Sequence, residues 1–264
     1  PMPGPVAAPA GPPAPFGPRT AAGGAALRQA VAEETLGIVG APFALAAKLV
    51  ERAGFDAIYL SGAAFSAGGL GVPDIGLFTR DQLVEQTRIL ARSVAIPLVV
   101  DADTGFGGPR AEAMAEKLAA AVAGRRDRGT VIIGRTDARG VHGLDDCLGR
   151  LHAYREAGAD WLFPEALSSR DEFARVGAEF RTAGTPLLAN MTEFGVGPLV
   201  SIPDLAEFGF AAVLYPVTLL RLAMKAMEAG LAVIAADGTQ ESLLDLMQSR
   251  EELYDLLGYD PRHP

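Results

Sequence analysis

The sequence predicts an α/β protein of the TIM-barrel, (β/α)8, type, and three observations lead to this fold class. Short apolar runs each end in polar or ionisable residues, as in IPLVVDADTG (96–105), TVIIGRTD (130–137) and DWLFPEA (160–166). Helical stretches of about ten to fifteen residues separate these runs, which favours a parallel sheet with helical crossovers. The 264 residues are sufficient for one barrel domain. In this fold class the loops after the strands build the active site.

Strands and helices follow in order from Leu36. The expected strands are 36–40, 56–60, 97–101, 130–134, 160–163, 186–190 and 212–215. The expected helices are 26–34, 42–53, 79–93, 110–124, 144–157, 170–182, 203–207, 217–229, 239–247 and 250–256. Gly54 and Gly158 stand where helices commonly end, and Thr79 is a favoured residue to begin one. A closed barrel of this type has eight strands, so the chain is expected to lack one β/α unit.

Three regions are expected along the chain. Residues 1–25 are rich in Pro, Gly and Ala and carry a single charge at Arg19, a composition typical of a disordered tail. Prolines interrupt any apolar core that a signal peptide would need. Residues 26–232 are expected to form the β/α barrel catalytic domain, and residues 233–264 a C-terminal helical segment.

Composition argues against several classes of partner. A net charge of −9 and a pI near 4.9 argue against nucleic-acid binding, because phosphate contacts need clustered Lys and Arg. No apolar run approaches the eighteen or so residues of a membrane span, so we expect a soluble protein without a membrane partner. Cys147 is the only cysteine, which rules out an intrachain disulfide and fits a cytoplasmic location.

Two aspartates at the end of one expected strand are candidate metal ligands. Asp101 and Asp103 flank Ala102, and residues i and i+2 of an extended strand point to the same side. Mg²⁺ is commonly held by one or two carboxylates, with substrate and water completing its coordination. The alternative interpretation is a helix-capping aspartate beside a solvated neighbour.

Further charged side chains follow two other expected strands. Arg135 could bind a substrate carboxylate with its planar guanidinium, or it could form a surface pair with Asp137. Glu165 could contact a ligand, act as a general base or neutralise Arg135.

Polar residues after the remaining strands could contact a polar substrate. Asn190, Thr192 and Glu193 offer hydrogen-bond donors and acceptors. Ser61 and Gly62 could present a hydroxyl and backbone N–H groups to a carboxylate, although a Ser-Gly pair often forms only a turn.

Cys147 and the histidines are not expected to take part in chemistry. Cys147 lies within an expected helix without a basic residue on its own turn, so we expect an inert thiol. The histidines at 142, 152 and 263 have no metal-ligand spacing.

Several longer strings resemble 2-methylisocitrate lyases of the isocitrate lyase/phosphoenolpyruvate mutase superfamily. The strings that carry the resemblance are YLSGAAFSAGGLGVPDIGLFT (59–79), PLVVDADTGFGG (97–108), VIIGRTDARGVHGLDD (131–146), LFPEAL (162–167), PLLANMTEFG (186–195), LYPVTLLRLAMKAMEAGL (214–231) and GTQESLLDLMQSREELYDLLGY (238–259). The resemblance therefore covers nearly everything from about residue 36 to residue 259.

The resemblance implies a (β/α)8 barrel whose C-terminal helices are exchanged between subunits of a homotetramer. It also implies a cytoplasmic, Mg²⁺-dependent enzyme, with Mn²⁺ as an alternative ion. Such an enzyme cleaves 2-methylisocitrate to pyruvate and succinate, a step of the methylcitrate cycle in propionate catabolism.

Residue by residue, the resemblance assigns roles at the mouth of the barrel. Asp101 and Asp103 would bind the metal, and Asp74 would contact it through water. Arg135 and Glu165 would be catalytic. The substrate would be contacted by Ser61, Gly62, Ala63, Arg135, Glu165, Asn190, Thr192 and Arg221.

The chain departs from the family between Gly108 and the strand at 130–134. Family members carry a further strand there, with a Glu-Asp-Gln that reaches the metal, and a gate loop whose cysteine is the catalytic acid/base. This chain has neither, and Cys147 does not replace that cysteine because it follows the Arg135 strand. The resemblance therefore predicts a lyase with impaired activity.

Two other readings are consistent with the sequence. The first is an oxaloacetate decarboxylase or phosphonopyruvate-type enzyme of the same superfamily. The second is a non-catalytic binding or assembly protein that keeps the oxyacid pocket or only the surface of the C-terminal helices.

Overall fold

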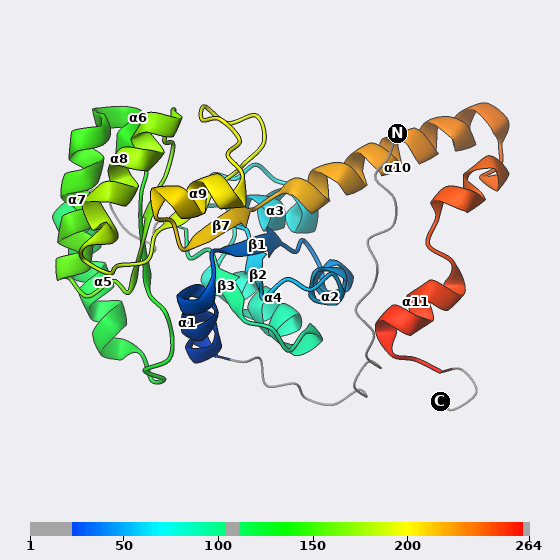
Figure 1. The fold of residues 1–264 in the computed structure, drawn as a ribbon. Helices are drawn as coiled ribbons and strands as arrows, with labels where there is room; N and C mark the ends of the chain where they lie inside the picture. The colour runs from blue at the N-terminus through cyan, green and yellow to red at the C-terminus, as the bar shows by residue number, and fades with distance from the viewer. Residues whose placement is uncertain (1–22, 104–110, 261–264) are drawn as a thin grey trace.

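The computed structural model describes residues 23–103 and 111–260, in which parallel strands are surrounded by helices (Figure 1). The strands are β1 (Leu36–Gly40), β2 (Ala57–Leu60), β3 (Leu98–Val100), β4 (Ile133–Thr136), β5 (Trp161–Pro164), β6 (Leu188–Asn190) and β7 (Ala212–Tyr215). The seven strands predicted from the sequence are thus all present.

Strand pairing gives an incomplete barrel. One sheet has the order β3-β2-β1-β7-β6, and a second sheet pairs β4 with β5. Every pairing is parallel, with Val39 beside Ile58 and Arg135 beside Phe163, for example. A single bridge from Leu162 to Leu187 joins the two sheets. Within the described residues β3 and β4 are not paired with each other, so the barrel is open at the place where the sequence predicts a missing unit.

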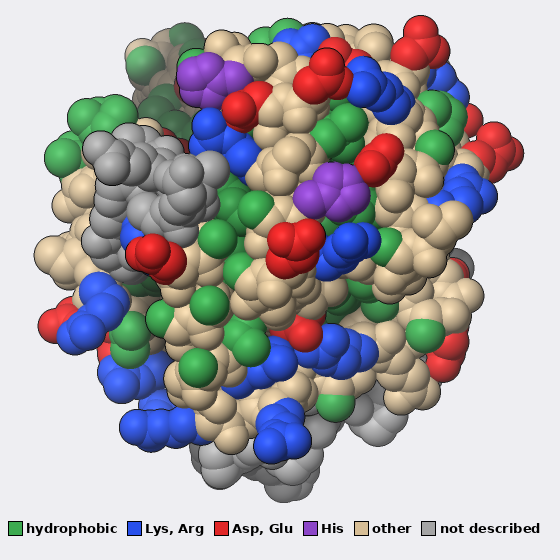
Figure 2. Space-filling model, turned by 90° about the vertical axis from the view of Figure 1, so that its left-hand side faces the viewer, with side chains coloured by type: hydrophobic (Ala, Val, Ile, Leu, Met, Phe, Trp, Pro, Cys, Tyr) green, Lys and Arg blue, Asp and Glu red, His purple; other side chains and the backbone are tan. Residues whose placement is uncertain are grey.

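The helices cover the outside of the strands. They are α1 (Gly24–Glu33), α2 (Ala44–Arg52), α3 (Gly62–Ala64), a π-helix (Phe65–Gly69), α4 (Arg80–Ser93), α5 (Ala111–Gly124), α6 (Ala138–His142), α7 (Leu144–Glu156), α8 (Arg170–Arg181), α9 (Ile202–Phe208), α10 (Thr218–Asp237), a 3₁₀-helix (Glu241–Leu246) and α11 (Arg250–Leu257). Figure 1 shows α5 to α8 grouped on one side of the molecule. Figure 2 views that side, where acidic and basic side chains stand among apolar ones.

Apolar side chains fill both the inside and the outside of the incomplete barrel. Inside, Ile38, Trp161 and Leu214 pack together, and Leu27 of α1 joins them. Outside, one cluster includes Leu90 of α4, and a second includes Leu151 of α7. Alternation along each strand produces this division, because successive side chains point to opposite faces.

Local sequence signals explain where several helices begin. Thr79 and Gln82 form a capping box at α4, and Ser249 and Glu252 form one at α11. Ser169 accepts a hydrogen bond from the backbone N–H of Glu172 at the start of α8.

Other boundaries differ from the sequence prediction. The strand expected at 130–134 begins only at Ile133 and ends at Thr136. Just before it, the Ile132 N–H donates a hydrogen bond to Asp160 Oδ2. The helix expected to end at 229 continues to Asp237 and stops where Gly238 adopts a left-handed conformation, with φ of 67°. Most of the expected tail, residues 1–22, lies outside the described residues. The boundary expected at 232/233 falls within α10.

The C-terminal segment leaves the barrel and returns to it. Figure 1 shows α10 projecting away from the strands, and none of its residues is buried. Beyond it, α11 contacts α2, where Arg52 Nη1 lies 3.2 Å from Asp255 Oδ2. No helix of the described residues has the length and apolar character needed to cross a membrane.

Candidate active site

The opening between β3 and β4 leads into a cavity of about 1110 Å³. At the carboxyl ends of the strands this cavity is lined by Asp74, Asp101 and Asp103, together with Arg135. The two aspartates from the end of β3 and the arginine of β4 therefore share one mouth. This is the arrangement expected when carboxyl ends of parallel strands meet at one edge of a barrel.

Asp101 is held by hydrogen bonds on both carboxylate oxygens. Oδ2 accepts a hydrogen bond from the Tyr59 hydroxyl at 3.0 Å and a longer one from the Gly62 N–H at 3.4 Å. Oδ1 accepts a hydrogen bond from the Asp103 N–H at 2.9 Å. Burial raises the pKa of Tyr59 well above its usual value, and the charge and hydrogen bond of Asp101 raise it further. Tyr59 therefore remains a hydrogen-bond donor at neutral pH.

The reasoning that placed Asp103 on the same side of a strand as Asp101 was wrong. β3 ends at Val100, and Asp103 has a φ of 52°, in the left-handed region. A tight turn closed by the Asp103 N–H and the Asp101 carboxylate brings the two residues together instead, a turn that aspartate readily forms. The alternative of a capping aspartate is partly realised, because Asp101 contacts the first residue of α3.

Asp74 stands near these two carboxylates. Its pKa is raised, first by partial removal of its carboxyl group from water and then by the negative charges of Asp101 and Asp103. Arg135 acts in the opposite direction on the same pKa. The three carboxylates thus form a region of concentrated negative charge, which a cation would neutralise.

Arg135 is surrounded by acidic and aromatic groups. Its Nη2 lies 2.8 Å from Asp137 Oδ1 and 3.5 Å from Glu165 Oε2, and its guanidinium stands over the Phe163 ring, 5.1 Å from the ring centre. Burial alone would lower its pKa, but the hydrogen bond to Asp137 and the nearby carboxylates outweigh burial, and the pKa is raised. Arg135 therefore forms the pair with Asp137 and also lines the cavity, where its binding of a substrate carboxylate stays a prediction.

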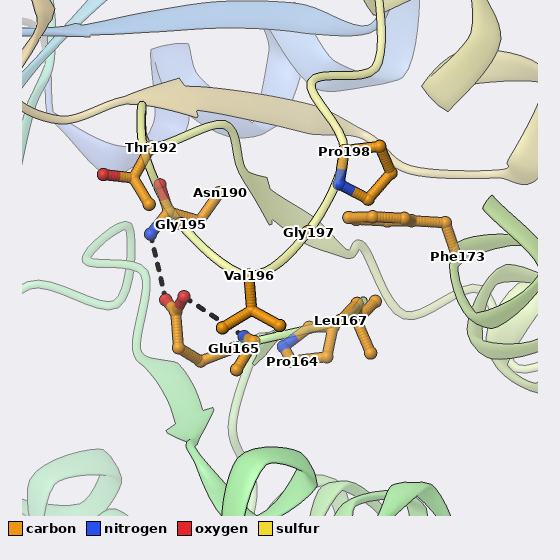
Figure 3. A pocket seen from close by; sticks show the side chains of 11 residues that line it. Pro164, Glu165, Leu167, Phe173, Asn190, Thr192, Gly195, Val196, Gly197 and Pro198 are labelled. Atoms are coloured by element: carbon orange, nitrogen blue, oxygen red, sulfur yellow. Dashed lines mark hydrogen bonds between the residues drawn. The ribbon is translucent and has the colours of Figure 1, made fainter. Parts of the chain in front are cut away.

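Glu165 belongs to a second, smaller cavity of about 220 Å³ (Figure 3). Its Oε2 accepts a hydrogen bond from Asn190 Nδ2 at 3.0 Å, and its Oε1 accepts one from the Ala166 N–H at 3.1 Å. Thr192 also lines this cavity, with Phe173 on its far side. The buried Asn190 Oδ1 lacks a hydrogen-bond partner within the described residues, and a ligand could supply a donor to it.

Of the other residues that the resemblance names, some line a cavity and some do not. Gly62 lines the larger cavity. Ser61 is buried, and its Oγ accepts a hydrogen bond from the Ala64 N–H as the cap of α3. Ser61, Ala63 and Arg221 do not line either cavity.

Arg221 instead contacts the loop after β6. Its Nε lies 3.6 Å from Glu193 Oε2, and its guanidinium stands over the Phe194 ring. Glu193 also accepts a hydrogen bond from the Thr218 hydroxyl. Glu193 therefore joins the loop after β6 to the start of α10.

Sequence reasoning did not single out two residues of this site, Tyr59 and Phe163. Both belong to apolar strand sequences and look like core residues. Strand alternation could have pointed to Tyr59, because it lies two residues before Ser61 and such residues face the same side of a strand. In the structure its hydroxyl donates a hydrogen bond to Asp101. Cys147, by contrast, is fully buried, and burial raises its pKa to about 11, as expected for an inert thiol.

The residues at the mouth are suited to a hard divalent cation. Carboxylate oxygens are the ligands that Mg²⁺ prefers, and Asp101 and Asp103 both line this cavity. Among the described residues no three of His, Cys, Asp and Glu converge closely enough to enclose a metal. A cation here would be held by Asp101 and Asp103 and would depend on water and substrate for its other ligands.

Known proteins resemble this chain over most of its length. The sequence profile of the phosphoenolpyruvate phosphomutase family matches residues 32–113 and 108–235. A 2-methylisocitrate lyase from Aeropyrum pernix is 41% identical, with 81% of this chain and 80% of that protein aligned. The 2-methylisocitrate lyase of Salmonella typhimurium is 38% identical, with 89% and 92% aligned.

Solved structures of the same superfamily have the same fold. A 2,3-dimethylmalate lyase superposes with a TM-score of 0.83 at 28% identity, over 91% of this chain and 96% of that chain. A phosphonopyruvate hydrolase in complex with oxalate and Mg²⁺ superposes with a TM-score of 0.81 at 28% identity, over 89% and 94%.

The alignments agree with the prediction of a missing β/α unit. The alignment with the Aeropyrum pernix protein runs over 251 positions but takes in 81% of the 264 residues here, which is about 214. About 37 positions of that relative therefore have no counterpart in this chain. The family profile matches in two pieces that meet at residues 108–113, between β3 and β4. From the profile match, the identity to 2-methylisocitrate lyases over most of its length and the shared fold, the chain belongs to the phosphoenolpyruvate phosphomutase family and is a 2-methylisocitrate lyase-like member of it.

Proposed function

We propose that this chain is a Mg²⁺-dependent lyase that cleaves 2-methylisocitrate to pyruvate and succinate, the reaction that propionate catabolism through the methylcitrate cycle requires. One observation carries the proposal. Asp101, Asp103 and Arg135 line the same cavity in a chain about 40% identical to 2-methylisocitrate lyases. A cation and a guanidinium at one mouth suit a substrate with several carboxylates.

The cleavage balances without an oxidant. The carbinol hydroxyl loses its proton and becomes the ketone of pyruvate, while the bond to the neighbouring carbon breaks. The electron pair passes to that carbon and its carboxylate, and uptake of a proton completes succinate. Mg²⁺, when bound, would supply Lewis-acid stabilisation of the oxygen that becomes the ketone.

The chain's own residues would bind and orient the substrate. Gly62, which lines the larger cavity, would present its backbone to the carboxylate of the pyruvate portion, and the Ser61 hydroxyl would hold the turn. Ala63 would contact the substrate only if this turn moved, because it lines neither cavity. Arg135 would stabilise the negative charge that develops during cleavage.

Polar residues of the smaller cavity would contact the rest of the substrate. Asn190 and Thr192 would donate hydrogen bonds there, and Glu165 would orient Asn190 and neutralise Arg135. Arg221 would enter the site only if it left Glu193, to which it is paired.

Proton delivery is the step in which this chain would be weak. The resemblance places the acid/base cysteine in the absent segment, and Cys147 cannot replace it, because it is buried with a pKa raised to about 11. Loss of a general acid typically costs a factor of about 10² to 10⁴ in rate. We therefore expect slow but Mg²⁺-dependent turnover.

We also propose a cytoplasmic homo-oligomer, specifically a tetramer. The long helix α10 exposes Leu222, Met227 and Leu231 to solvent, with Leu231 at 66% exposure. An apolar surface of this kind on a projecting helix is typical of a subunit interface. The single buried cysteine is compatible with a reducing compartment.

Pyruvate release tests the proposal. The purified chain is incubated with Mg²⁺ and 2-methylisocitrate, with oxaloacetate and phosphonopyruvate as competing substrates and the Asp101→Asn variant as background. We expect slow cleavage of 2-methylisocitrate that requires Mg²⁺ and Asp101. Faster turnover of either competitor would assign the chain to that activity instead. Binding of Mg²⁺ and pyruvate by calorimetry without any turnover would identify a non-catalytic binding protein.

A further inference from the structure

The opening in the barrel wall forms a slot that leads away from the proposed metal site. β3 is paired only with β2, and β4 only with β5, within the described residues. The larger cavity runs between these two strands from Asp101 and Arg135 at the mouth to Pro97 and Thr130 at the opposite end. Four residue steps separate Pro97 from Asp101, which corresponds to roughly 13 Å of extended strand.

Asp101, Asp103 and Arg135 line the mouth of this cavity, Asp127 lines its far end, and Lys117 lines it from α5. Apolar side chains line much of the slot between the two ends. Val99 of β3 and Ile133 of β4 line the cavity, together with Met114 and Leu118 of α5. Val99 and Leu118 are almost completely buried, whereas Ile133 and Met114 are half-buried. The slot therefore remains accessible, so water can still reach the strand edges.

The cavity is larger than a small acid requires. Pockets for ligands of drug size span about 300 to 1,000 Å³, whereas this cavity has about 1110 Å³. A tricarboxylic acid with a single methyl group would occupy the charged mouth and leave the apolar slot unfilled. A bound methyl group beside such a slot can be extended without a steric clash.

We propose that the slot accommodates an alkyl chain, and that the substrates of this chain include 2-alkyl homologues of 2-methylisocitrate with substituents well beyond methyl. The inference rests on the proposed function, because the carboxylates and the carbinol of the substrate must first occupy the mouth. The same carbon–carbon bond breaks, the carbinol oxygen loses its proton, and the succinate carbon gains one. The products are succinate and a 2-oxo acid that carries the alkyl chain.

Binding of 2-oxo acids of increasing length tests the slot without requiring turnover. Calorimetry in the presence of Mg²⁺ compares pyruvate, 2-oxohexanoate and 2-oxodecanoate, with decanoate as the control for non-specific binding. Each methylene that leaves water should strengthen binding about three- to fourfold. We expect 2-oxohexanoate to bind at least about tenfold more tightly than pyruvate, and decanoate to bind weakly because it lacks the oxo acid.

A matched pair of substitutions on α5 tests where the alkyl chain of the ligand lies. Ala121 and Ala123 are both exposed on α5, but only Ala121 lines the cavity. Ala121→Phe should lower the affinity ratio of 2-oxodecanoate to pyruvate at least about tenfold, as expected for displacement of several buried methylenes. Ala123→Phe should leave that ratio unchanged.

The outcomes separate this inference from the proposed function. Equal affinity for pyruvate and the longer acids, or an equal effect of the two phenylalanine variants, would refute binding of an alkyl chain in the slot, even if 2-methylisocitrate is cleaved. Tighter binding of the longer acids that is lost only in Ala121→Phe would support the slot. The same binding result without any cleavage of 2-methylisocitrate would refute the lyase activity but still support binding of an alkyl chain in the slot.

Discussion

Replacement of Arg135 by lysine tests whether the guanidinium itself is needed at the mouth. Lysine retains the positive charge but cannot present two parallel N–H groups to a carboxylate. The probe is oxalate with Mg²⁺, a planar dianion that mimics the enolate of pyruvate. Arg135 lines the cavity with its side chain 39% exposed, so a bound anion can reach its free N–H groups.

The expected loss follows from the contacts of Arg135. Exchanging a charge-assisted, two-point contact for a single one removes about 1.5 to 3 kcal/mol of binding free energy. This corresponds to an oxalate affinity about ten- to a hundredfold lower. The folding cost should stay below about 1 kcal/mol, because the pair with Asp137 is partly exposed and lysine keeps its charge.

Arg139→Lys is the control for this substitution. Arg139 makes a two-point contact with Glu172 at 2.8 and 2.9 Å but does not line either cavity. The Arg139→Lys variant should be less stable than the wild type in thermal unfolding and should keep the wild-type affinity for oxalate in calorimetry. If Arg135→Lys bound oxalate as tightly as the wild type, or if Arg139→Lys weakened binding equally, the reasoning about the mouth would be refuted.

Three further predictions concern stability and assembly. In a urea titration, Gly177→Ala should destabilise the fold by about 3 kcal/mol or more, because the new Cβ would lie 1.7 Å from the Phe208 carbonyl oxygen. Gly149→Ala is the control, because the space around Gly149 is open. It should stabilise the protein by about 0.5 to 1 kcal/mol in the same titration. Asp160→Asn should cost about 1 to 3 kcal/mol at pH 7, since Asp160 binds Arg28, Arg125 and the Ile132 N–H. Burial opposes the hydrogen bonds of Asp160, but its pKa is lowered in the folded state. This stabilisation is therefore present above the usual pKa of aspartate and should disappear as the pH falls through the lower pKa of the folded protein. A stability difference between wild type and Asp160→Asn that stayed constant down to pH 2 would contradict this prediction. Leu231→Glu, on the exposed face of α10, should shift sedimentation towards a smaller species, and an unchanged sedimentation coefficient would place the subunit interface elsewhere.

The strands and the edge on which the candidate site lies were predictable because they depend on local pattern. Apolar runs such as LVV before Asp101 indicate buried parallel strands, and polar residues after such runs indicate the carboxyl ends. The absent unit was predictable for a related reason. Between β3 and β4 the sequence has no second apolar run, and the described part of that segment contains one helix, α5.

Side-chain pairing and turn geometry were not predictable from local pattern. The proximity of Asp103 to Asp101 comes from a left-handed turn rather than from strand alternation. The contact of Tyr59 with Asp101 joins residues 42 positions apart, which local pattern does not encode. The hydrogen bond from the Ile132 N–H to the Asp160 side chain joins residues 28 positions apart. The pairing of Arg221 with Glu193 likewise depends on the position of α10 relative to the loop after β6.

Cation binding by the mouth is the most direct test of the account. Calorimetric titration of Mg²⁺, or the Mn²⁺ spin-resonance signal, is compared for the wild type and the variants Asp101→Asn, Asp103→Asn and Asp127→Asn, the last at the far end of the same cavity. We predict one divalent-cation site that is abolished by either of the first two substitutions and unchanged in Asp127→Asn. Retention of wild-type affinity in Asp101→Asn and Asp103→Asn would contradict the account.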